Sequence, residues 1–263
     1  MSIPIPRPTD ADLAEINALL DWHAGAPLPD GRLLGRLGRS PGKRAAPAAI
    51  PDKRIRRLHK MLNLKNKRVL EIGCFEGIHT VGLRQFCEDV TAIDVRPQNV
   101  LKTMTRLSWH GVSAHVHQFD AELITPDFPS FDVIYHIGVL YHLTNPIEHL
   151  LNLSKICQHL YLDTHVAAPE KANVTLEVAG HTYRAAKHRE GGWADPFSGK
   201  DSYAVWLTCE SLLDALSQAG FAEVQVLEKR AERNGPRVLI LATTQSEARE
   251  EVRATRREKK AVL

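Results

Sequence analysis

The segment from Val69 to Thr80 combines residue types that suit nucleotide binding. A short apolar run leads directly into a loop bracketed by Gly73 and Gly77, and helical periodicity follows the loop. Glycine adopts backbone angles that other residues avoid and lets a ligand approach the chain closely. In α/β proteins a nucleotide binds at such a point, where a strand of a parallel sheet ends and a helix begins. The segment therefore predicts a nucleotide-binding loop.

The details of this loop argue against a dinucleotide. The NAD fingerprint requires glycine at the positions of Gly73, Phe75 and Ile78, and the sequence meets only the first. Two acids, Glu71 and Glu76, would add negative charge beside a pyrophosphate. S-adenosylmethionine instead carries a sulfonium and an ammonium group, so its charge is complementary to these carboxylates. The loop therefore favours S-adenosylmethionine over NAD.

Two further acids follow apolar runs in the same region. Asp94 ends the second run, where a carboxylate can accept hydrogen bonds from both ribose hydroxyls. Asp120 ends the third run, where a carboxylate can receive the adenine amino group. Either acid alone is also a common helix N-cap. Because the glycine loop and both acids occur in this order, a binding site for S-adenosylmethionine is favoured over two unrelated helix N-caps.

The pattern Glu71-x-Gly73-x-x-x-Gly77, with Asp94 and Asp120, resembles the class I S-adenosylmethionine-dependent methyltransferases over about residues 66–245. The resemblance implies an α/β fold with a Rossmann-like, seven-stranded, mostly parallel sheet whose final strand is reversed. It also implies S-adenosylmethionine as cofactor and S-adenosylhomocysteine as product. The cofactor-binding residues that we expect are Glu71, Gly73, Cys74, Phe75, Gly77, His79, Asp94, Val95, Asp120, Ala121 and His136.

A second motif narrows the likeness. Gly138 to His142, followed by Pro146, is similar to a motif of the enzymes that modify the tRNA wobble uridine through a carboxymethyl group. It also resembles related bacterial methyltransferases that act on glycans and natural products. Two features differ from the tRNA enzymes: Leu143 and Thr144 replace basic residues, and Gln158-His159 replaces a Gly-Gly pair. These departures favour a small-molecule or glycan acceptor, with RNA as the alternative partner.

Three residues are candidates for catalysis at the same edge of the sheet. Tyr141 and His142 follow the fourth apolar run, and His165 ends the fifth. Histidine titrates near neutral pH and tyrosine can donate or accept a proton, so these residues are expected to orient the acceptor or take its proton. Inward packing and turn capping are the alternative roles for Tyr141 and His142.

An insertion at about residues 168–205 is expected to cover the site as a lid or substrate wall. Its first part, Val174 to Tyr183, is predicted to be a hairpin that turns at Ala179-Gly180. The candidate acceptor contacts in the insertion are Tyr183, Arg189, Trp193 and Trp206. Each is also explained by packing, so the prediction concerns the segment.

The elements that must position these residues alternate along the chain. Short apolar runs and helical segments of about ten residues predict a parallel sheet with right-handed crossovers. The expected strands are 68–72, 89–94, 113–119, 131–136 and 159–166, and the expected helices include 78–87, 146–157 and 209–220. Two last strands, 223–229 and 237–243, flank Asn234-Gly235. This turn signal predicts a hairpin, so one edge strand should run antiparallel.

The remaining chain divides into an N-terminal extension and linker, residues 1–65, and a charged tail, residues 246–263. Helices are expected at 10–22 and 52–63. Between Gly31 and Lys60 the sequence holds ten Lys or Arg residues and one acid, Asp52. Such a run can meet phosphates of RNA or of a nucleotide-linked substrate. The other interpretation is a solvated linker followed by a helix with a basic face.

Composition excludes several classes of protein. The 263 residues are 43% hydrophobic and 25% charged, and no apolar stretch is long enough for a membrane span. The N-terminus lacks the apolar core of a secretion signal, and the four cysteines are isolated, so we expect a reduced, cytoplasmic protein. The thirteen histidines form no compact ligand signature, so no metal site is predicted.

These features together predict an S-adenosylmethionine-dependent methyltransferase acting on an oxygen or nitrogen of a soluble small-molecule or glycan acceptor. The first alternative is a tRNA wobble-uridine carboxymethyltransferase. The second is a methyltransferase fold that serves as a non-catalytic binding subunit. The sequence does not predict an oligomeric state.

Overall fold

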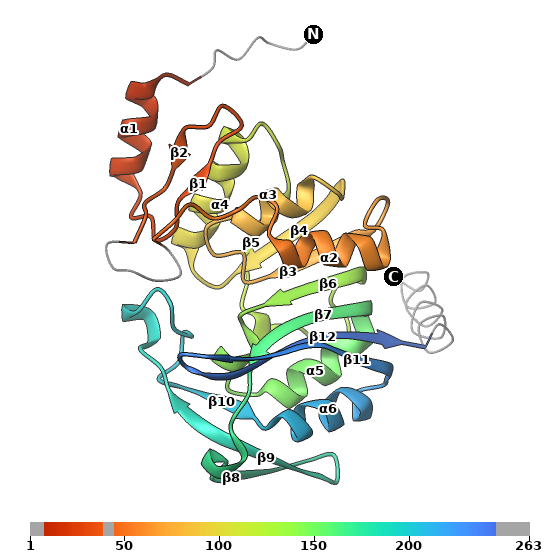
Figure 1. Cartoon of the computed structure of the whole chain (residues 1–263). Helices are drawn as coiled ribbons and strands as arrows, with labels where there is room; N and C mark the ends of the chain where they lie inside the picture. The colour runs from red at the N-terminus through yellow and green to blue at the C-terminus, as the bar shows by residue number, and fades with distance from the viewer. Residues whose placement is uncertain (1–7, 39–44, 246–263) are drawn as a thin grey trace, which may run out of the picture. The chain divides into compact units, whose positions relative to one another are not determined.

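The computed structural model describes residues 8–38 and 45–245 and contains a seven-stranded sheet with helices packed against it (Figure 1). The strand order is β11-β12-β7-β6-β3-β4-β5. This order and the pairing directions confirm the predicted Rossmann-like fold. The strands are β3 (Arg68–Ile72), β4 (Asp89–Asp94), β5 (His115–Gln118), β6 (Phe131–Ile137), β7 (Cys157–His165), β11 (Phe221–Glu232) and β12 (Gly235–Thr244).

The chain forms two compact units. The first comprises Met1–Asn66 and Cys74–Gln118, and the second comprises Lys67–Gly73 and Phe119–Leu263. In the first unit β4 and β5 pair in parallel, with Asp94 opposite Gln118. The helices of this unit are α1 (Asp10–Leu19), α2 (Lys53–Leu62), α3 (Ile78–Arg84) and α4 (Pro97–Trp109).

The N-terminal part of the first unit folds around a small apolar cluster. Leu13 of α1 packs with Trp22, Leu28 and Leu34, where the chain forms the two-residue strands β1 (Ala26–Pro27) and β2 (Leu33–Leu34). The fully buried Arg106 of α4 supports this segment, because its guanidinium donates to the carbonyls of Glu76, Leu34 and Ala24. The segment predicted as a linker therefore includes a packed region.

In the second unit β3, β6 and β7 are parallel. β12 runs antiparallel to both β7 and β11, which confirms the predicted hairpin and the reversed final strand. The edge strand β11 pairs antiparallel with β12, which confirms that one edge strand runs antiparallel to its neighbour. The helices of this unit are α5 (Pro146–Ile156) and α6 (Cys209–Gln218).

The insertion carries a sheet of its own. Three antiparallel strands follow the order β10-β9-β8 and comprise β8 (Val174–Val178), β9 (His181–Arg189) and β10 (Tyr203–Leu207). The turn between β8 and β9 is the predicted one, with left-handed backbone at Ala179 (φ 51°) and Gly180 (φ 81°). The third strand was not predicted.

None of the helices in the described ranges is long and apolar enough to cross a membrane. The predicted charged tail, residues 246–263, and the middle of the basic run, residues 39–44, lie outside the described residues. The part of the basic run that is described includes α2, which begins after the N-cap Asp52 and ends at Leu62, before the left-handed C-cap Asn63.

Candidate functional site

The glycine loop is closed onto the end of β4 in the first unit. The backbone N–H of Cys74 donates to the carbonyl of Ile93 at 3.0 Å, and that of Phe75 donates to Asp94 Oδ2 at 2.9 Å. Phe75 adopts a left-handed conformation (φ 51°), which is uncommon for a residue with a bulky side chain. The loop is therefore shaped by hydrogen bonds to the neighbouring strand.

Both bracketing glycines are required by close packing. A Cβ at Gly77, where φ is 77°, would lie 2.9 Å from Thr103 Cα of α4. In the second unit, a Cβ at Gly73 would overlap the side chain of Val139. The Cys74 thiol also contacts α4, where it accepts a hydrogen bond from the Thr103 hydroxyl at 3.3 Å. The glycine spacing thus reflects the fit of the loop to its surroundings.

Asp94, the expected ribose acid, is buried and already hydrogen bonded. Its Oδ1 accepts from the backbone of Arg96 at 2.9 Å and from Asn99 Nδ2 at 3.0 Å, while Oδ2 accepts from Phe75. Burial raises the pKa of Asp94, although these hydrogen bonds oppose the shift. A carboxylate offers about four acceptor positions, so one remains on Oδ2. The acid can take one ligand hydroxyl without losing an existing bond.

The expected attraction of Glu76 for a cationic donor was wrong. Its buried carboxylate accepts from the backbone of His23 at 2.7 Å and of Ala24 at 2.9 Å, and it forms an ion pair with Lys102 at 3.0 Å. The charge of Glu76 is therefore compensated by groups of the protein itself. The side chain of Glu71 is also buried, with 1% of its surface exposed.

His79 lies in the first turn of α3 and contacts the start of α2. Its Nε2 is 3.7 Å from Asp52 Oδ2 and 3.3 Å from Arg54 Nη2. Burial would raise the pKa of Asp52, but hydrogen bonds from His79 and Arg54 outweigh it and lower the pKa strongly. Val95, the other expected contact, accepts at its carbonyl from Gln118. Arg54 was not predicted as part of this cluster.

In the second unit, Asp120 combines its helix-capping role with an ion pair. Asp120 Oδ1 accepts from the backbone of Glu122 at 3.0 Å, at the start of the short 3-10 helix η1 (Ala121–Leu123). Lys200 Nζ lies 3.4 Å from Asp120 Oδ2 and 3.3 Å from Glu122 Oε2. Ala121, the next residue, is buried. The expected adenine acid therefore shares its charge with a lysine of the insertion, which sequence reasoning missed.

His136, an expected cofactor contact, lies in the core instead. Its side chain is completely buried, and its Nε2 is 3.0 Å from Nε2 of His149 on α5. Burial and the neighbouring His149 lower the pKa of His136 well below its ordinary value. The ring is therefore a neutral core group, and this position corrects the expectation of a cofactor contact at the strand end.

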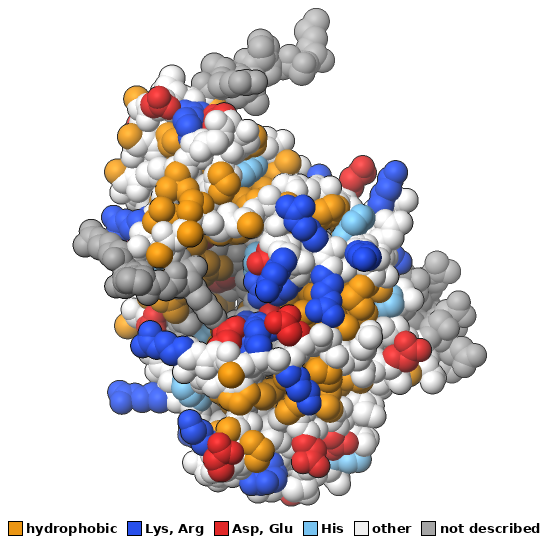
Figure 2. Space-filling view, in the orientation of Figure 1, with side chains coloured by type: hydrophobic (Ala, Val, Ile, Leu, Met, Phe, Trp, Pro, Cys, Tyr) orange, Lys and Arg blue, Asp and Glu red, His pale blue; other side chains and the backbone are white. Residues whose placement is uncertain are grey.

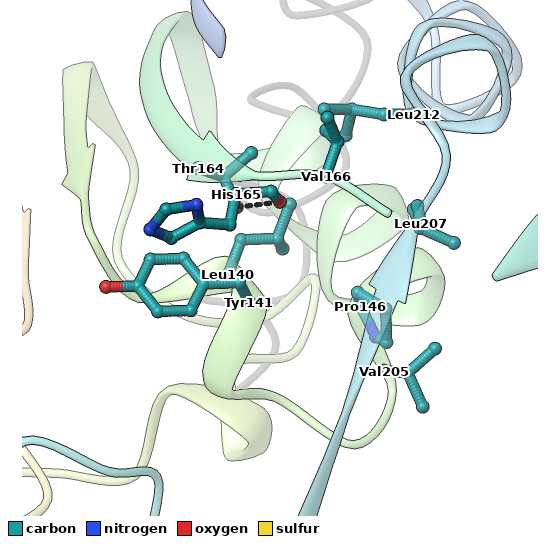
Figure 3. A pocket seen from close by; sticks show the side chains of 9 residues that line it. All are labelled: Leu140, Tyr141, Pro146, Thr164, His165, Val166, Val205, Leu207 and Leu212. Atoms are coloured by element: carbon teal, nitrogen blue, oxygen red, sulfur yellow. Dashed lines mark hydrogen bonds between the residues drawn. The ribbon is translucent and has the colours of Figure 1, made fainter. Parts of the chain in front are cut away.

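Tyr141 and His165 face each other across the edge of the second unit (Figure 3). Their rings meet edge-on with centroids 4.8 Å apart. His165 Nδ1 lies 3.2 Å from the carbonyl of Pro236, and its Nε2 lies 3.4 Å from Arg237 Nη1. Burial raises the pKa of Tyr141, although Arg237 opposes the shift. Both nitrogens of His165 are engaged, and the phenol of Tyr141 is held in its protonated form.

A small pocket lies beside these two rings. Figure 3 shows Tyr141 and His165 on one side of it, with apolar side chains such as Val205 and Leu207 on the other. Its interior has room for about one water molecule. An organic acceptor therefore requires a different surface.

A buried cluster of ion pairs contacts Tyr141 and His165. Arg237 Nε lies 2.5 Å from Asp163 Oδ1, and Arg230 Nη2 lies 2.8 Å from both oxygens of the same carboxylate. The Arg237 guanidinium also stacks on Tyr141, 5.3 Å from the ring centroid. The two arginines were not predicted; a charged residue in an otherwise apolar strand, as at Arg237, was the available signal.

His142 is held by an acid of the insertion. Its Nδ1 lies 2.9 Å from Glu190 Oε1, and Glu190 Oε2 accepts from the backbone of Gly199 at 2.9 Å. Within the described part of the chain, Nε2 of His142 has no hydrogen-bond partner. Among the three catalytic candidates, His142 thus keeps an available ring nitrogen. Glu190 was not predicted.

The four expected acceptor contacts divide into exposed and buried side chains. Trp193 is 57% exposed and Arg189 is exposed, whereas Tyr183 (2%) and Trp206 (7%) are buried. Trp206 stacks between His188 at 4.2 Å and His165 at 5.2 Å, as measured between ring centroids. The accessible candidates are therefore Trp193 and Arg189, and the other two pack within the second unit.

Curated relatives cover only part of this chain. The tRNA U34 carboxymethyltransferase of Shewanella loihica is 34% identical over 93 residues, which are 34% of this chain and 28% of that protein. The same-named protein of Idiomarina loihiensis is 26% identical over 175 residues, 63% of this chain and 49% of that protein. The chain thus spans about a quarter to a half of the length of these relatives.

Solved structures share the fold more completely. The N-terminal domain of EvdMO1, with SAH bound, has a TM-score of 0.66 at 22% identity and covers 80% of this chain and 91% of its own. Magnesium protoporphyrin IX methyltransferase from Synechocystis PCC 6803, with bound SAM, has a TM-score of 0.52 at 14% identity, over 73% and 76% of the two chains.

A family model described as "Methyltransferase domain" matches residues 44–226. The match includes the glycine loop, Asp94, Asp120, the Tyr141-His142 motif and the whole insertion. It covers more than half of the chain. The chain therefore belongs to the methyltransferase domain family.

Proposed function

We propose that this protein transfers the methyl group of S-adenosylmethionine to an oxygen or nitrogen of a small-molecule or glycan acceptor. The observation that carries the proposal is the anchoring of the glycine loop on Asp94, through the 2.9 Å bond from the Phe75 N–H. Family membership and the SAH and SAM bound in structural neighbours support the same donor. A cytoplasmic location remains a prediction.

The first unit offers groups that suit the donor. The free acceptor position on Asp94 Oδ2 suits a ribose hydroxyl, and Gly77 keeps the loop free of a side chain against α4. In the second unit, Asp120 offers the carboxylate that we assign to the adenine amino group. S-adenosylmethionine supplies a methyl group that its sulfonium already activates. The protein then has to orient the acceptor, exclude water and remove a proton.

His142 is the residue that we assign to proton removal. His165 has both nitrogens engaged, and the buried phenol of Tyr141 has a raised pKa, so neither is a suitable base. His142 retains Nε2, which can accept the proton of an acceptor hydroxyl or amine. Trp193, with 57% exposure, and Arg189 are the assigned acceptor contacts.

The proposal is tested by offering methyl-labelled S-adenosylmethionine and the protein to a fractionated cell extract. Mass spectrometry should find label in a small molecule or glycan, and calorimetry should find donor binding. Donor binding without turnover in any fraction would favour the non-catalytic binding subunit. Asp94→Ala is the matched negative control, since it removes the proposed donor contact.

A tRNA substrate is the second candidate, because the curated relatives carry the name tRNA U34 carboxymethyltransferase. The surroundings of the motif argue against it. The backbone and hydroxyl of Thr144 donate to Glu122 at 2.6 and 2.7 Å, so an acid occupies the turn where the tRNA enzymes carry basic residues. On the face shown in Figure 2, Lys and Arg side chains are interspersed with Asp and Glu.

Salt dependence separates the two acceptors. An enzyme that neutralises several RNA phosphates loses affinity by roughly 10³-fold between 50 and 200 mM salt. We expect a shallow dependence for a small acceptor held by aromatic and hydrogen-bonding contacts. Strong, salt-sensitive labelling of total tRNA, beside weak labelling of a metabolite extract, would instead support the tRNA enzyme.

A further inference from the structure

The insertion contributes a charged group to the proposed base. Glu190 directly follows β9, 48 residues after His142 in sequence, and its Oε1 lies 2.9 Å from His142 Nδ1. We infer that Glu190 is a positioning residue that orients His142 to remove the acceptor's proton. This inference rests on the proposed methyl transfer and assigns part of its machinery to the insertion, which therefore does more than cover the site.

The carboxylate of Glu190 is itself fixed at both oxygens. Oε2 accepts from the Gly199 N–H at 2.9 Å, while Oε1 faces His142. The residue is 8% exposed, and its backbone N–H donates to the Ser202 carbonyl at 3.0 Å. The turn between them is tied by the Ser198 hydroxyl, which accepts from Gly191 and donates to Asp195. The acid therefore has a defined position.

This pairing selects the tautomer that a base needs. When Nδ1–H donates to the carboxylate, the lone pair of the neutral imidazole lies on Nε2. Nε2 can then accept the proton from the acceptor's O–H or N–H, while Glu190 remains ionised beside the imidazolium. The proton later passes to water, and His142 returns to its starting form. No oxidant or further reactant is needed.

Glu190 stays ionised over the range in which histidine titrates. Burial alone would raise its pKa, but the hydrogen bond and charge of His142 and the bond from Gly199 lower it below its ordinary value. The pair is thus intact at neutral pH. Its stabilising contribution is present above pH 4.5, the ordinary pKa, and is lost as the pH falls below it.

Other charges on neighbouring elements are already paired. Lys200, next to Gly199, lies 3.4 Å or less from Asp120, Glu122 and Asp201, and Arg237 binds Asp163. The ring that flanks His142 is the uncharged Tyr141, at 4.2 Å between centroids. Among the described residues, Glu190 is therefore the charged group that contacts the imidazole of His142.

The backbone of the insertion also fits closely against His142. A Cβ at Gly199 would lie 2.6 Å from the His142 carbonyl oxygen. The same glycine supplies the N–H that fixes Glu190. Glycine at this position thus lets the insertion approach the motif closely enough for the carboxylate to reach the ring.

The experiment compares Glu190→Gln and Glu190→Asp with wild type, using labelled donor and the acceptor fraction found above. We expect Glu190→Gln to lower kcat by roughly 10- to 100-fold, a range typical when a histidine loses its orienting partner. Glu190→Asp should recover part of the rate. The exposed Glu177, which binds Thr182 on the same small sheet, supplies the control Glu177→Gln.

Donor affinity and thermal unfolding are measured as well, because a purely structural role of Glu190 would change both of them. Calorimetry should give the same donor Kd for Glu190→Gln as for wild type. A folded Glu190→Gln variant with wild-type kcat would overturn the role of Glu190 while leaving methyl transfer intact. If Glu190→Gln does not fold, a folded Glu190→Asp variant with wild-type kcat would overturn the role instead. Failure of wild type to transfer label at all would overturn the proposed function, and the inference with it.

Discussion

Glu76 Oε1 lies 3.0 Å from Nζ of Lys102, and both side chains are almost completely buried. The same carboxylate holds the backbone of His23 and Ala24, so the glycine loop and the N-terminal segment share one anchor. The loop of the expected donor site is therefore stabilised by residues that precede the predicted methyltransferase domain.

Lys102→Met should destabilise the protein strongly. Removing one partner of a buried ion pair leaves the other charge uncompensated, and the free energy of unfolding typically falls by about 3 to 5 kcal/mol. Urea unfolding followed by circular dichroism provides the measurement. Lys60→Met, at an exposed site on α2, is the control and should change stability little. Equal stability of Lys102→Met and wild type would show that Glu76 needs no cationic partner.

Asp94→Ala should weaken donor binding by roughly tenfold or more. Loss of a charged hydrogen bond changes binding by about 1.5 to 3 kcal/mol, and the variant also releases the Phe75 N–H that shapes the loop. Calorimetry with S-adenosylmethionine measures the effect. Glu88→Gln, at an exposed acid in the same unit, should bind normally. Unchanged affinity in folded Asp94→Ala would remove this acid from the donor site.

Gly77→Ala should be more damaging than Gly111→Ala. Both glycines have positive φ, 77° and 65°, so both substitutions meet backbone strain of about 1 to 2 kcal/mol. Only Gly77 faces the Thr103 backbone at 2.9 Å, whereas Gly111 has open space within 4 Å. Overpacking adds about 1 to 3 kcal/mol. Comparing the unfolding free energies of the two variants isolates the contact with α4; equal losses would mean that this contact is relaxed.

His142→Ala should lower kcat by roughly 10²-fold at nearly unchanged donor affinity, as for a general base. Tyr141→Phe should have a smaller effect on kcat, because its buried phenol stays protonated. Steady-state kinetics combined with donor calorimetry distinguishes the roles. Equal losses of rate and donor binding in His142→Ala would place this residue against the cofactor instead.

Trp193→Ala should raise the acceptor KM by roughly three- to tenfold, which corresponds to an aromatic contact of about 0.5 to 1.5 kcal/mol. Deleting the Val174 to Tyr183 hairpin is a poorer test, since Tyr183 is buried and its loss would disturb folding. Leu19→Ala, at a 73% exposed site on α1, is the control. An unchanged KM would exclude Trp193 from the acceptor surface.

The protein should become less stable as the pH falls from 7 to 5. Burial lowers the pKa of His149 to about 4, against an ordinary value of 6.5, so the unfolded chain binds a proton in this range that the folded chain does not. The loss for this residue is about 2 kcal/mol. His149→Gln should flatten the dependence of unfolding free energy on pH, and the exposed His115→Gln should leave it unchanged. Parallel curves for both variants would contradict the burial effect.

The sequence by itself determined the order of the main strands and helices and the position of the glycine loop. Apolar runs ending at Gly73 and Asp94 encode strand ends, and strand ends of a parallel sheet meet at one edge. Asn234-Gly235 encodes a tight turn that reverses the chain. These features are local, since each depends on residues close together in sequence.

Tertiary structure alone decided which side chains meet. Glu190 reaches His142 across 48 residues, and Arg237 reaches Asp163 across 74, because strand register and the insertion bring them together. Register also turned His136 inward toward His149. From the sequence, the carboxylate of Glu76 was interpreted as a ligand contact. A buried charge requires partners, and the tertiary structure places Lys102 beside Glu76 as that partner.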